Sequence, residues 1–295
     1  MRKTSVYLPE QTKAALHDAS VRWGRSEAEL IRQAIEQLLR SGADAGGSRG
    51  RAAAPVLTGP RLIGVGVGPS APDLVTQRAL DVLERADRVF AASTAPDAIA
   101  HAEAIVRVAA PHVSVDRLPL AIAGDADTFA SCLDAAADIL IGDLDRGQVV
   151  AFLTLGDPNV YSTFPALARR VAARRPAVPV ATVPGIMSFQ ELAAETGTVL
   201  AEGDERVELV TMRDDLSAVD AALERPDCTV VLYRGGRHVP AVAERLRAHR
   251  RLDGAVIGEM MGLPGGRSGP VADVAGRPAS YLATVVIPAE RATPS

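Results

Sequence analysis

Residues 149–167 read VVAFLTLGDPNVYSTFPAL, an apolar run that ends at Gly156, Asp157 and Pro158 and is followed by a second apolar pattern. Residues 149–155 contain no charged side chain, which is typical of a strand buried on both faces. Gly156 and Pro158 break the strand, and we expect a helix over residues 160–171. A strand, a tight turn and a helix in this order indicate one unit of an α/β sheet.

The same order recurs on both sides of this stretch. Further strands are predicted at residues 62–67, 178–183, 207–211, 229–233, 255–257 and 282–287, and an amphipathic helix over 129–140. The alternation predicts an α/β domain with mainly parallel strands. The proline-marked stretch 175–184 is a plausible hinge, so we expect one lobe at residues 60–180 and another at 181–290.

Composition limits the function. The 295 residues are 47% hydrophobic and 23% charged, with a formal net charge of −4, which argues against a general nucleic-acid binder. Cys132 and Cys228 lack metal-ligand spacing, so we expect no metal site. The sequence shows no signal peptide and no segment of membrane-spanning length, so we expect a cytoplasmic protein without a membrane partner.

Residues 1–40 have a separate pattern. Residues 3–8 alternate as a strand, and two amphipathic helices follow, the second with Ser26 and Glu29 as a capping box. One strand cannot satisfy its own backbone, which favours pairing of two copies. The RSEAELIRQAI stretch at residues 25–35 makes this module resemble ribbon-helix-helix domains. Residues 41–59, rich in glycine, alanine and serine, are predicted to be a flexible linker.

The ribbon-helix-helix resemblance implies contact with DNA through the strand and the start of the second helix. The residues it assigns to DNA are Lys3, Ser5, Tyr7 and Ser26. Seven basic and five acidic residues make the module only mildly basic, so a module that only dimerises the protein remains the alternative.

The order of motifs after residue 60 resembles that of the tetrapyrrole methylases. GVGPSAPDLVT at residues 66–76 is followed by TLGDPNVYSTF, then VPGIMSF, then VVLYRGGR. The YSTF after GDP and the SF after PGI favour the branch that methylates precorrin-2 at C20, in cobalamin biosynthesis. The resemblance implies a two-lobed α/β fold, a homodimer, and S-adenosylmethionine bound between the lobes.

The resemblance also implies the residues that bind the cofactor. Carried over motif by motif, they are Pro69, Leu155, Gly156, Asp157, Val160, Met187, Ser188, Arg234, Gly235 and Met261. Taken alone, the glycine loop at residues 64–68 is a weak signal, because the G-x-G-x-x-G pattern ends on Ala71.

The implied reaction moves a methyl group from a sulfonium to an enamine-like carbon of a reduced tetrapyrrole. Positioning and exclusion of water matter most in such a reaction. A base could help the proton leave, and Glu259, Tyr161 and His238 are candidates, but no catalytic residue is assigned. A substrate with many carboxylates needs guanidinium groups, and the candidates are Arg213, Arg234, Arg237 and Arg267.

One departure from the family pattern stands in the first loop. The family has GPGDP, whereas this chain has Ser70 and Ala71 in place of the second glycine and the aspartate. Two alternatives therefore stay open. The enzyme could act on cobalt-factor II or on a peptide, or a degenerate methylase domain could sense a ligand and control the N-terminal module.

Overall fold

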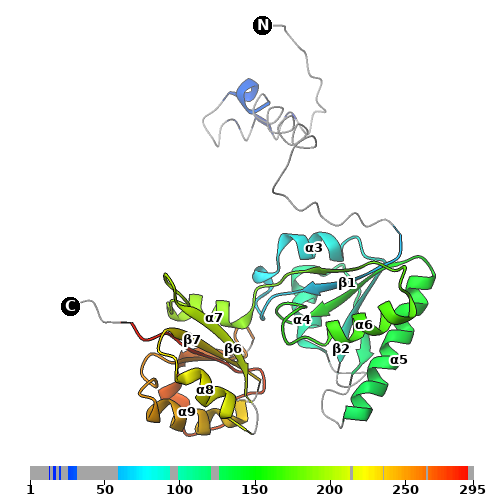
Figure 1. Cartoon of the computed structure of the whole chain (residues 1–295). Helices are drawn as coiled ribbons and strands as arrows, with labels where there is room; N and C mark the ends of the chain where they lie inside the picture. The colour runs from blue at the N-terminus through cyan, green and yellow to red at the C-terminus, as the bar shows by residue number, and fades with distance from the viewer. Residues whose placement is uncertain are drawn as a thin grey trace. The chain divides into compact units, whose positions relative to one another are not determined.

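The computed structural model describes residues 13, 16, 17, 20, 26–31, 59–93, 99–120, 126–212, 215–234, 236–263 and 265–291. The chain divides into two units, Met1–Ala53 and Ala54–Ser295, which are treated separately below (Figure 1).

In the first unit, a helix follows Ser26 at residues 27–31. The Ser26 hydroxyl accepts a hydrogen bond from the Glu29 amide at 3.3 Å, and the Glu29 carboxylate accepts one from the Ser26 amide at 3.4 Å. The predicted capping box is therefore confirmed. Lys3, Ser5 and Tyr7 lie outside the described residues, as do residues 41–58 of the linker.

The second unit contains two sheets, of which the first is entirely parallel. Its order is β3-β2-β4-β1-β5, and it pairs through parallel ladders on both sides of β1 and β4. The strands are β1 (Arg61–Gly66), β2 (Arg88–Ser93), β3 (Asp116–Pro119), β4 (Val149–Thr154) and β5 (Val180–Val183). Strand β4 is buried along its whole length, which explains why residues 149–154 carry no charge.

Helices cover both faces of this sheet, and β1 shows how the faces alternate. Ile63 and Val65 pack in one apolar cluster with residues of α3 (Gln77–Leu83) and α4 (His101–Ala109). Leu62 packs in another cluster with residues of α5 (Ala126–Asp145) and α6 (Phe164–Arg174). Because β1 and β4 are parallel neighbours, the loops that follow them lie at the same, carboxyl edge of this covered sheet.

The second sheet has the order β6-β7-β10-β8-β9. Its strands are β6 (Arg206–Thr211), β7 (Cys228–Tyr233), β8 (Val256–Glu259), β9 (Arg267–Pro270) and β10 (Thr284–Ile287). Helix α7 (Ser188–Thr196) packs on one side, and α8 (Ser217–Leu223) and α9 (Val239–Ala248) pack on the opposite side (Figure 1).

Three expectations need correction. Mainly parallel pairing holds for the first sheet, but in the second only β6 and β7 are parallel, because β10 inserts antiparallel between β7 and β8. The helix expected over 160–171 starts at Phe164, because Tyr161 has a φ of +48° that a helix cannot accommodate. The lobe boundary expected after residue 180 falls inside β5, which pairs with β1, so the chain leaves the first sheet after Val183.

None of the helices in the described part of the chain combines the length and hydropathy that a bilayer-spanning segment needs.

Candidate functional site

Three loops meet at the carboxyl edge of the first sheet. The Gly156 amide donates to the Gly68 carbonyl at 2.8 Å, which joins the loops after β4 and β1. A Cβ on Gly66 would lie 2.5 Å from the Gly156 oxygen, and a Cβ on Gly185 would lie 2.1 Å from the same oxygen. Gly66 and Gly185 are therefore needed because backbone packs directly on backbone at both positions.

Asp157 holds two of these loops together. One carboxylate oxygen accepts from the Asn159 amide at 2.8 Å, and the other accepts from the Gly185 amide at 3.2 Å. The side chain thus closes its own turn and ties it to the Pro-Gly turn after β5. Strands β1 and β4 are neighbours whose connections leave toward opposite sides of the sheet, and this arrangement is where open α/β sheets bind ligands.

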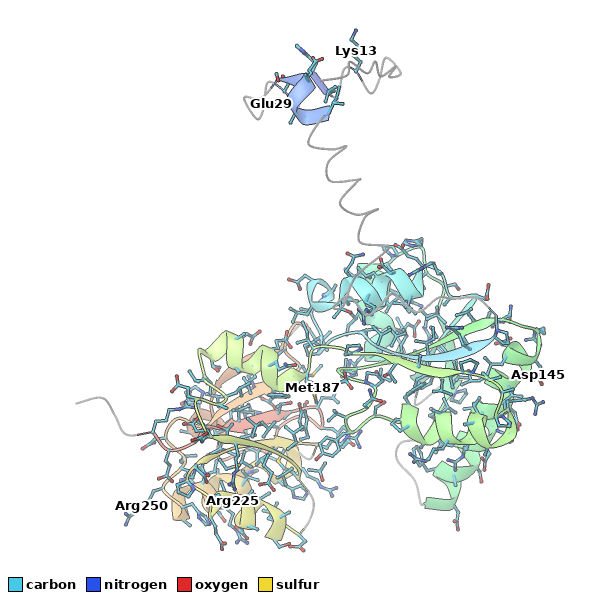
Figure 2. All side chains as sticks on the ribbon, turned by 45° about the horizontal axis from the view of Figure 1, so that its top comes forward. Lys13, Glu29, Asp145, Met187, Arg225 and Arg250 are labelled. Atoms are coloured by element: carbon cyan, nitrogen blue, oxygen red, sulfur yellow. The ribbon has the colours of Figure 1, made fainter. Side chains whose placement is uncertain are left out.

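A cavity of about 690 Å³ opens at this point. It is lined by the loops after β1 and β4, by the start of α7, and by the ends of β7, β8 and β10. Met187 stands where the chain passes from the first sheet to the second (Figure 2). Nine residues expected to bind the cofactor line the cavity: Pro69, Leu155, Gly156, Asp157, Val160, Met187, Ser188, Arg234 and Met261. Gly235 lies outside the described residues.

A second cavity, of about 440 Å³, shares Arg234 and Tyr281 with the first. Arg237 and His238 also line it, and the Arg237 Nε lies 3.0 Å from the His238 Nε2. Two of the four arginines expected to bind substrate, Arg234 and Arg237, are therefore at a cavity. Arg213 lies outside the described residues, and Arg267 lines neither of the two cavities.

Backbone strain is concentrated at the larger cavity. Among the described residues, four that are not glycine have positive φ, and three of them line it: Tyr161 at 48°, Arg234 at 53° and Met260 at 49°. Such conformations are costly and are retained mainly at functional sites. The Tyr161 carbonyl accepts a hydrogen bond from the Arg234 guanidinium, so two strained residues are joined across the cavity.

Aromatic rings form part of the wall. The Tyr161 and Tyr233 ring centroids are 5.7 Å apart, and Phe189 meets Tyr233 edge-on. Burial raises the pKa of Tyr233 to about 12, so its hydroxyl stays protonated at neutral pH. The Tyr161 hydroxyl donates to the Leu209 carbonyl at 2.8 Å. Tyr161, one of the three candidates for a base, therefore already has a hydrogen-bond partner for its hydroxyl.

Glu259 is a structural carboxylate in this fold. It accepts hydrogen bonds from the Arg267 and Arg277 guanidinium groups and, at 2.9 Å, from the Ser280 amide. Burial acts to raise the pKa of Glu259, but the bonds from these three groups outweigh it and lower the pKa. A carboxylate held in this way is a weak base, and it does not line either cavity.

Several residues that line the cavity were not among the expected site residues, and His101 and Ser70 are two of them. His101 is exposed and lines the cavity at the first turn of α4. Ser70 also lines it and is buried. Apolar side chains form much of the rest of the first-lobe wall, among them Ala92, Ala102, Ile105, Phe129 and Phe152, and the polar Thr154, Ser162 and Thr163 also line it.

Comparisons with known proteins agree with this geometry. Residues 61–271 match the tetrapyrrole (corrin/porphyrin) methylase family. The chain is 31% identical over 243 residues to the cobalamin biosynthesis protein CobIJ of Mycobacterium bovis, which covers 78% of this chain and 46% of that protein. The chain thus spans about half of the length of that relative.

The precorrin-2 C(20)-methyltransferase of a Sinorhizobium species is 28% identical over 237 residues, covering 77% of this chain and 95% of that protein. The solved structure of the cobalt precorrin-4 methyltransferase CbiF shares the fold, with a TM-score of 0.59 and 20% identity over 77% of this chain and 94% of that one. The family match runs from β1 to Val271, so it covers the first sheet, every strand of the second sheet except β10, and the three loops that meet at Gly156. The chain therefore belongs to the tetrapyrrole (corrin/porphyrin) methylases.

Proposed function

We propose that this chain transfers a methyl group from S-adenosylmethionine to C20 of precorrin-2, in cobalamin biosynthesis. The observation that carries the proposal is the cavity at the carboxyl edge of the first sheet, which gathers the residues of four separate motifs. The similarity to the Sinorhizobium protein, over 95% of that protein's length, supports precorrin-2 as the substrate.

The residues present fit S-adenosylmethionine. A cavity of about 690 Å³ is within the usual range for small-molecule sites. Gly156 has a φ of +68°, and a Cβ there would have only the Ile186 oxygen, at 4.0 Å, as a neighbour, so its bare backbone faces open space. Leu155, Gly156, Met187 and Ser188 would hold the cofactor, which supplies an electrophilic methyl group when bound.

The protein's own contribution is mainly to position the reactants and to exclude water. The apolar first-lobe wall, from Ala92 to Phe152, suits the face of a macrocycle. Arg234 and Arg237, at the second cavity, would bind carboxylates of the substrate through paired N–H donors. Because Arg234 lines both cavities, it would bind a substrate carboxylate where the two cavities meet.

The first prediction concerns the cofactor. Val160→Trp should lower the affinity for S-adenosylhomocysteine by at least roughly tenfold, equivalent to about 1.4 kcal/mol, because the indole would occupy cavity space. Isothermal titration calorimetry measures the change. Val160 is a better position for this test than Gly156, because a Gly156→Val substitution would also strain the backbone at its positive φ.

Val199→Trp is the matched control, because Val199 is 45% exposed and lies outside the cavity lining. It should bind S-adenosylhomocysteine as the unmodified protein does. Equal affinities for the two variants would remove the loop after β4 from the cofactor site.

The second prediction concerns the substrate. Arg237→Ala should raise the KM for precorrin-2 by roughly 10- to 100-fold, because a hydrogen bond to a charged group contributes about 1.5–3 kcal/mol. The affinity for S-adenosylhomocysteine should not change. Steady-state kinetics give the KM, and a KM equal to that of the unmodified protein would place the substrate carboxylates elsewhere.

One assay of labelled methyl transfer, run with three tetrapyrroles, tests which branch of the family the chain belongs to. Precorrin-2, cobalt-precorrin-2 and uroporphyrinogen III are supplied in turn, and the highest kcat/KM is expected with precorrin-2. The cobalt-containing substrate is the second candidate, because the cobalt-precorrin-2 C(20)-methyltransferase of Salmonella typhimurium is 26% identical over 178 residues. Preference for uroporphyrinogen III would contradict the proposal.

A ligand-sensing regulator is the candidate of another class, favoured by Ser70 and Ala71 in the first loop. In that case residues 1–40 would bind DNA as a dimer, and S-adenosylmethionine or precorrin-2 would have to bind one DNA-competent state better than another. Binding of a DNA library by the full chain, with and without each ligand, tests this. A ligand-dependent change in DNA affinity without methyl transfer would replace the enzyme proposal.

A further inference from the structure

Ser70 connects the cavity to a buried carboxylate. It stands in the loop after β1, is 6% exposed and lines the larger cavity. Its hydroxyl donates to the Glu191 Oε2 at 3.4 Å. Glu191 belongs to the first turn of α7, on the second lobe, and is 7% exposed. The pair therefore reaches from the cavity wall into the junction between the lobes.

The loop that carries Ser70 is held firmly against the second lobe. A Cβ on Gly262, in the turn between β8 and β9, would lie 2.8 Å from the Ala71 nitrogen and 3.1 Å from the Ser70 Cβ. Only glycine allows this approach of the two loops. The loop at Ser70 is thus held against Gly262, and the Ser70 hydroxyl lies beside the Glu191 carboxylate.

Three other polar groups at or near the cavity are engaged within the structure itself. Asp157 accepts from two backbone amides, and Glu259 accepts from two arginines and one amide. The Tyr161 hydroxyl donates to a backbone carbonyl. Glu191, by contrast, faces Ser70, whose hydroxyl can both donate a proton and accept one.

We propose that Ser70 and Glu191 form the relay that removes the proton from the methylated carbon of the substrate. This inference rests on the proposed function. After the methyl group has bonded to the carbon, the C–H bond breaks and its electron pair returns to the macrocycle. The proton passes to the Ser70 Oγ while the Ser70 hydroxyl proton passes to the Glu191 carboxylate. No oxidant or further reactant is needed.

The distance between the Ser70 hydroxyl and the Glu191 carboxylate fits a hydrogen bond that shortens when the substrate binds. A separation of 3.4 Å is long for an O–H···O hydrogen bond, but catalytic hydrogen bonds are commonly long before the substrate binds. In the sequence, the relay occupies the loop in which the family has an aspartate and this chain has Ala71.

The environment of Glu191 suits a proton acceptor. Burial raises the pKa of Glu191, the charges of Glu195 and Asp73 raise it further, and the hydrogen bond from Ser70 opposes them. The charged groups of β8 and β9, which also pack on α7, are Glu259 and Arg267, and these two pair with each other. A carboxylate with a raised pKa is a stronger base than an exposed one.

Kinetics of precorrin-2 methylation test the relay. Ser70→Ala and Glu191→Gln should each lower kcat by about 100-fold, and the double variant should be no slower than the slower single variant, because both residues serve one step. The affinity for S-adenosylhomocysteine should stay within about twofold of the unmodified value, since neither change fills the cavity. Should Glu191→Gln fail to fold, Ser70→Ala alone carries the comparison.

The pH profile separates a relay from a packing role. Glu191 must be ionised to accept the proton, so kcat should fall as the pH falls through its raised pKa, and Glu191→Gln should lack this acidic limb. Glu195→Gln removes a neighbouring negative charge, so it should move the limb to lower pH while kcat at high pH is retained.

The outcomes distinguish the relay from the proposed function. If the unmodified protein methylates precorrin-2 and either variant keeps kcat within about twofold, or Glu191→Gln keeps the acidic limb, the relay is wrong and the function stands. If the unmodified protein binds S-adenosylhomocysteine but methylates no tetrapyrrole, the proposed function fails, and the relay fails with it.

Discussion

Replacing Gly185 by alanine is expected to lower the free energy of unfolding by about 3 kcal/mol, because overpacking a rigid contact costs this much or more. The new Cβ would lie 2.1 Å from the Gly156 oxygen and 2.9 Å from the Gly66 Cα, and these atoms belong to backbone that cannot turn aside. The midpoint of thermal unfolding should therefore fall by roughly 6–12 °C in a domain of this size.

Gly276→Ala is the matched control for this substitution. Gly276 has no heavy atom within 4 Å of the Cβ position and no positive φ, so the melting temperature should stay nearly unchanged. Differential scanning calorimetry of both variants makes the comparison. A Gly185→Ala protein as stable as the control would show that the three loops do not pack backbone to backbone.

Glu259→Gln is expected to cost about 2 kcal/mol of unfolding free energy at pH 7, because it leaves hydrogen-bond donors at a buried site without their charged partner. Arg267 and Arg277 are half exposed and can regain water, so the loss stays below that of a fully buried pair. Urea denaturation measures the difference. The exposed Glu224, on the end of α8, provides a control variant, Glu224→Gln, with almost no expected effect.

The contribution of Glu259 to the free energy of unfolding should decrease as the pH falls. The folded pKa of Glu259 is lowered from its usual value of 4.5, so its contribution is fully present above that value and is lost as the pH falls through the lowered folded pKa. The stability difference between Glu259→Gln and the unmodified protein should therefore shrink on acidification. A difference that stays constant on acidification would mean that Glu259 acts through packing and not through charge.

Most strands with a buried apolar sequence were predicted, although β2 was missed, and the mixed strand β6 was also predicted. Strands β1, β4 and β7 are almost wholly buried, so burial itself removes charge from their sequence. Strand β9, RSGP, is an edge strand, mostly exposed on its residues, and carries no pattern from which a strand could be expected. The antiparallel place of β10 depends on contacts between distant residues, which local periodicity does not record.

The motif loops were predictable because each one has a local cause. Gly66 and Gly185 are required by close backbone contacts and Gly156 by its positive φ, and such requirements leave a mark in the sequence. The relay of Ser70 and Glu191 leaves no such mark, since the two residues are 121 positions apart and each has an ordinary local sequence. The place of His101 at the cavity leaves no mark in the local sequence either, because only the packing of α4 brings it there.

The sequence also predicted arginines at the substrate without deciding which ones. Arg237 and Arg267 are alike in type, and both follow glycine in the chain. Arg237 lines a cavity, whereas Arg267 is bonded to Glu259. The difference comes from their places in the fold, because Arg237 lies in the 3-10 helix Gly236–His238, whereas β9 pairs with β8 and so places Arg267 opposite Glu259.

Methyl transfer followed by nuclear magnetic resonance tests the central claim most directly. The full chain is incubated with precorrin-2 and S-adenosylmethionine that carries carbon-13 in its methyl group, and the product is isolated under anaerobic conditions. The account predicts one new labelled methyl group, bonded to C20 of the macrocycle, together with an equal amount of S-adenosylhomocysteine. Label at another ring carbon, or no labelled product from a protein that binds S-adenosylhomocysteine, would contradict it.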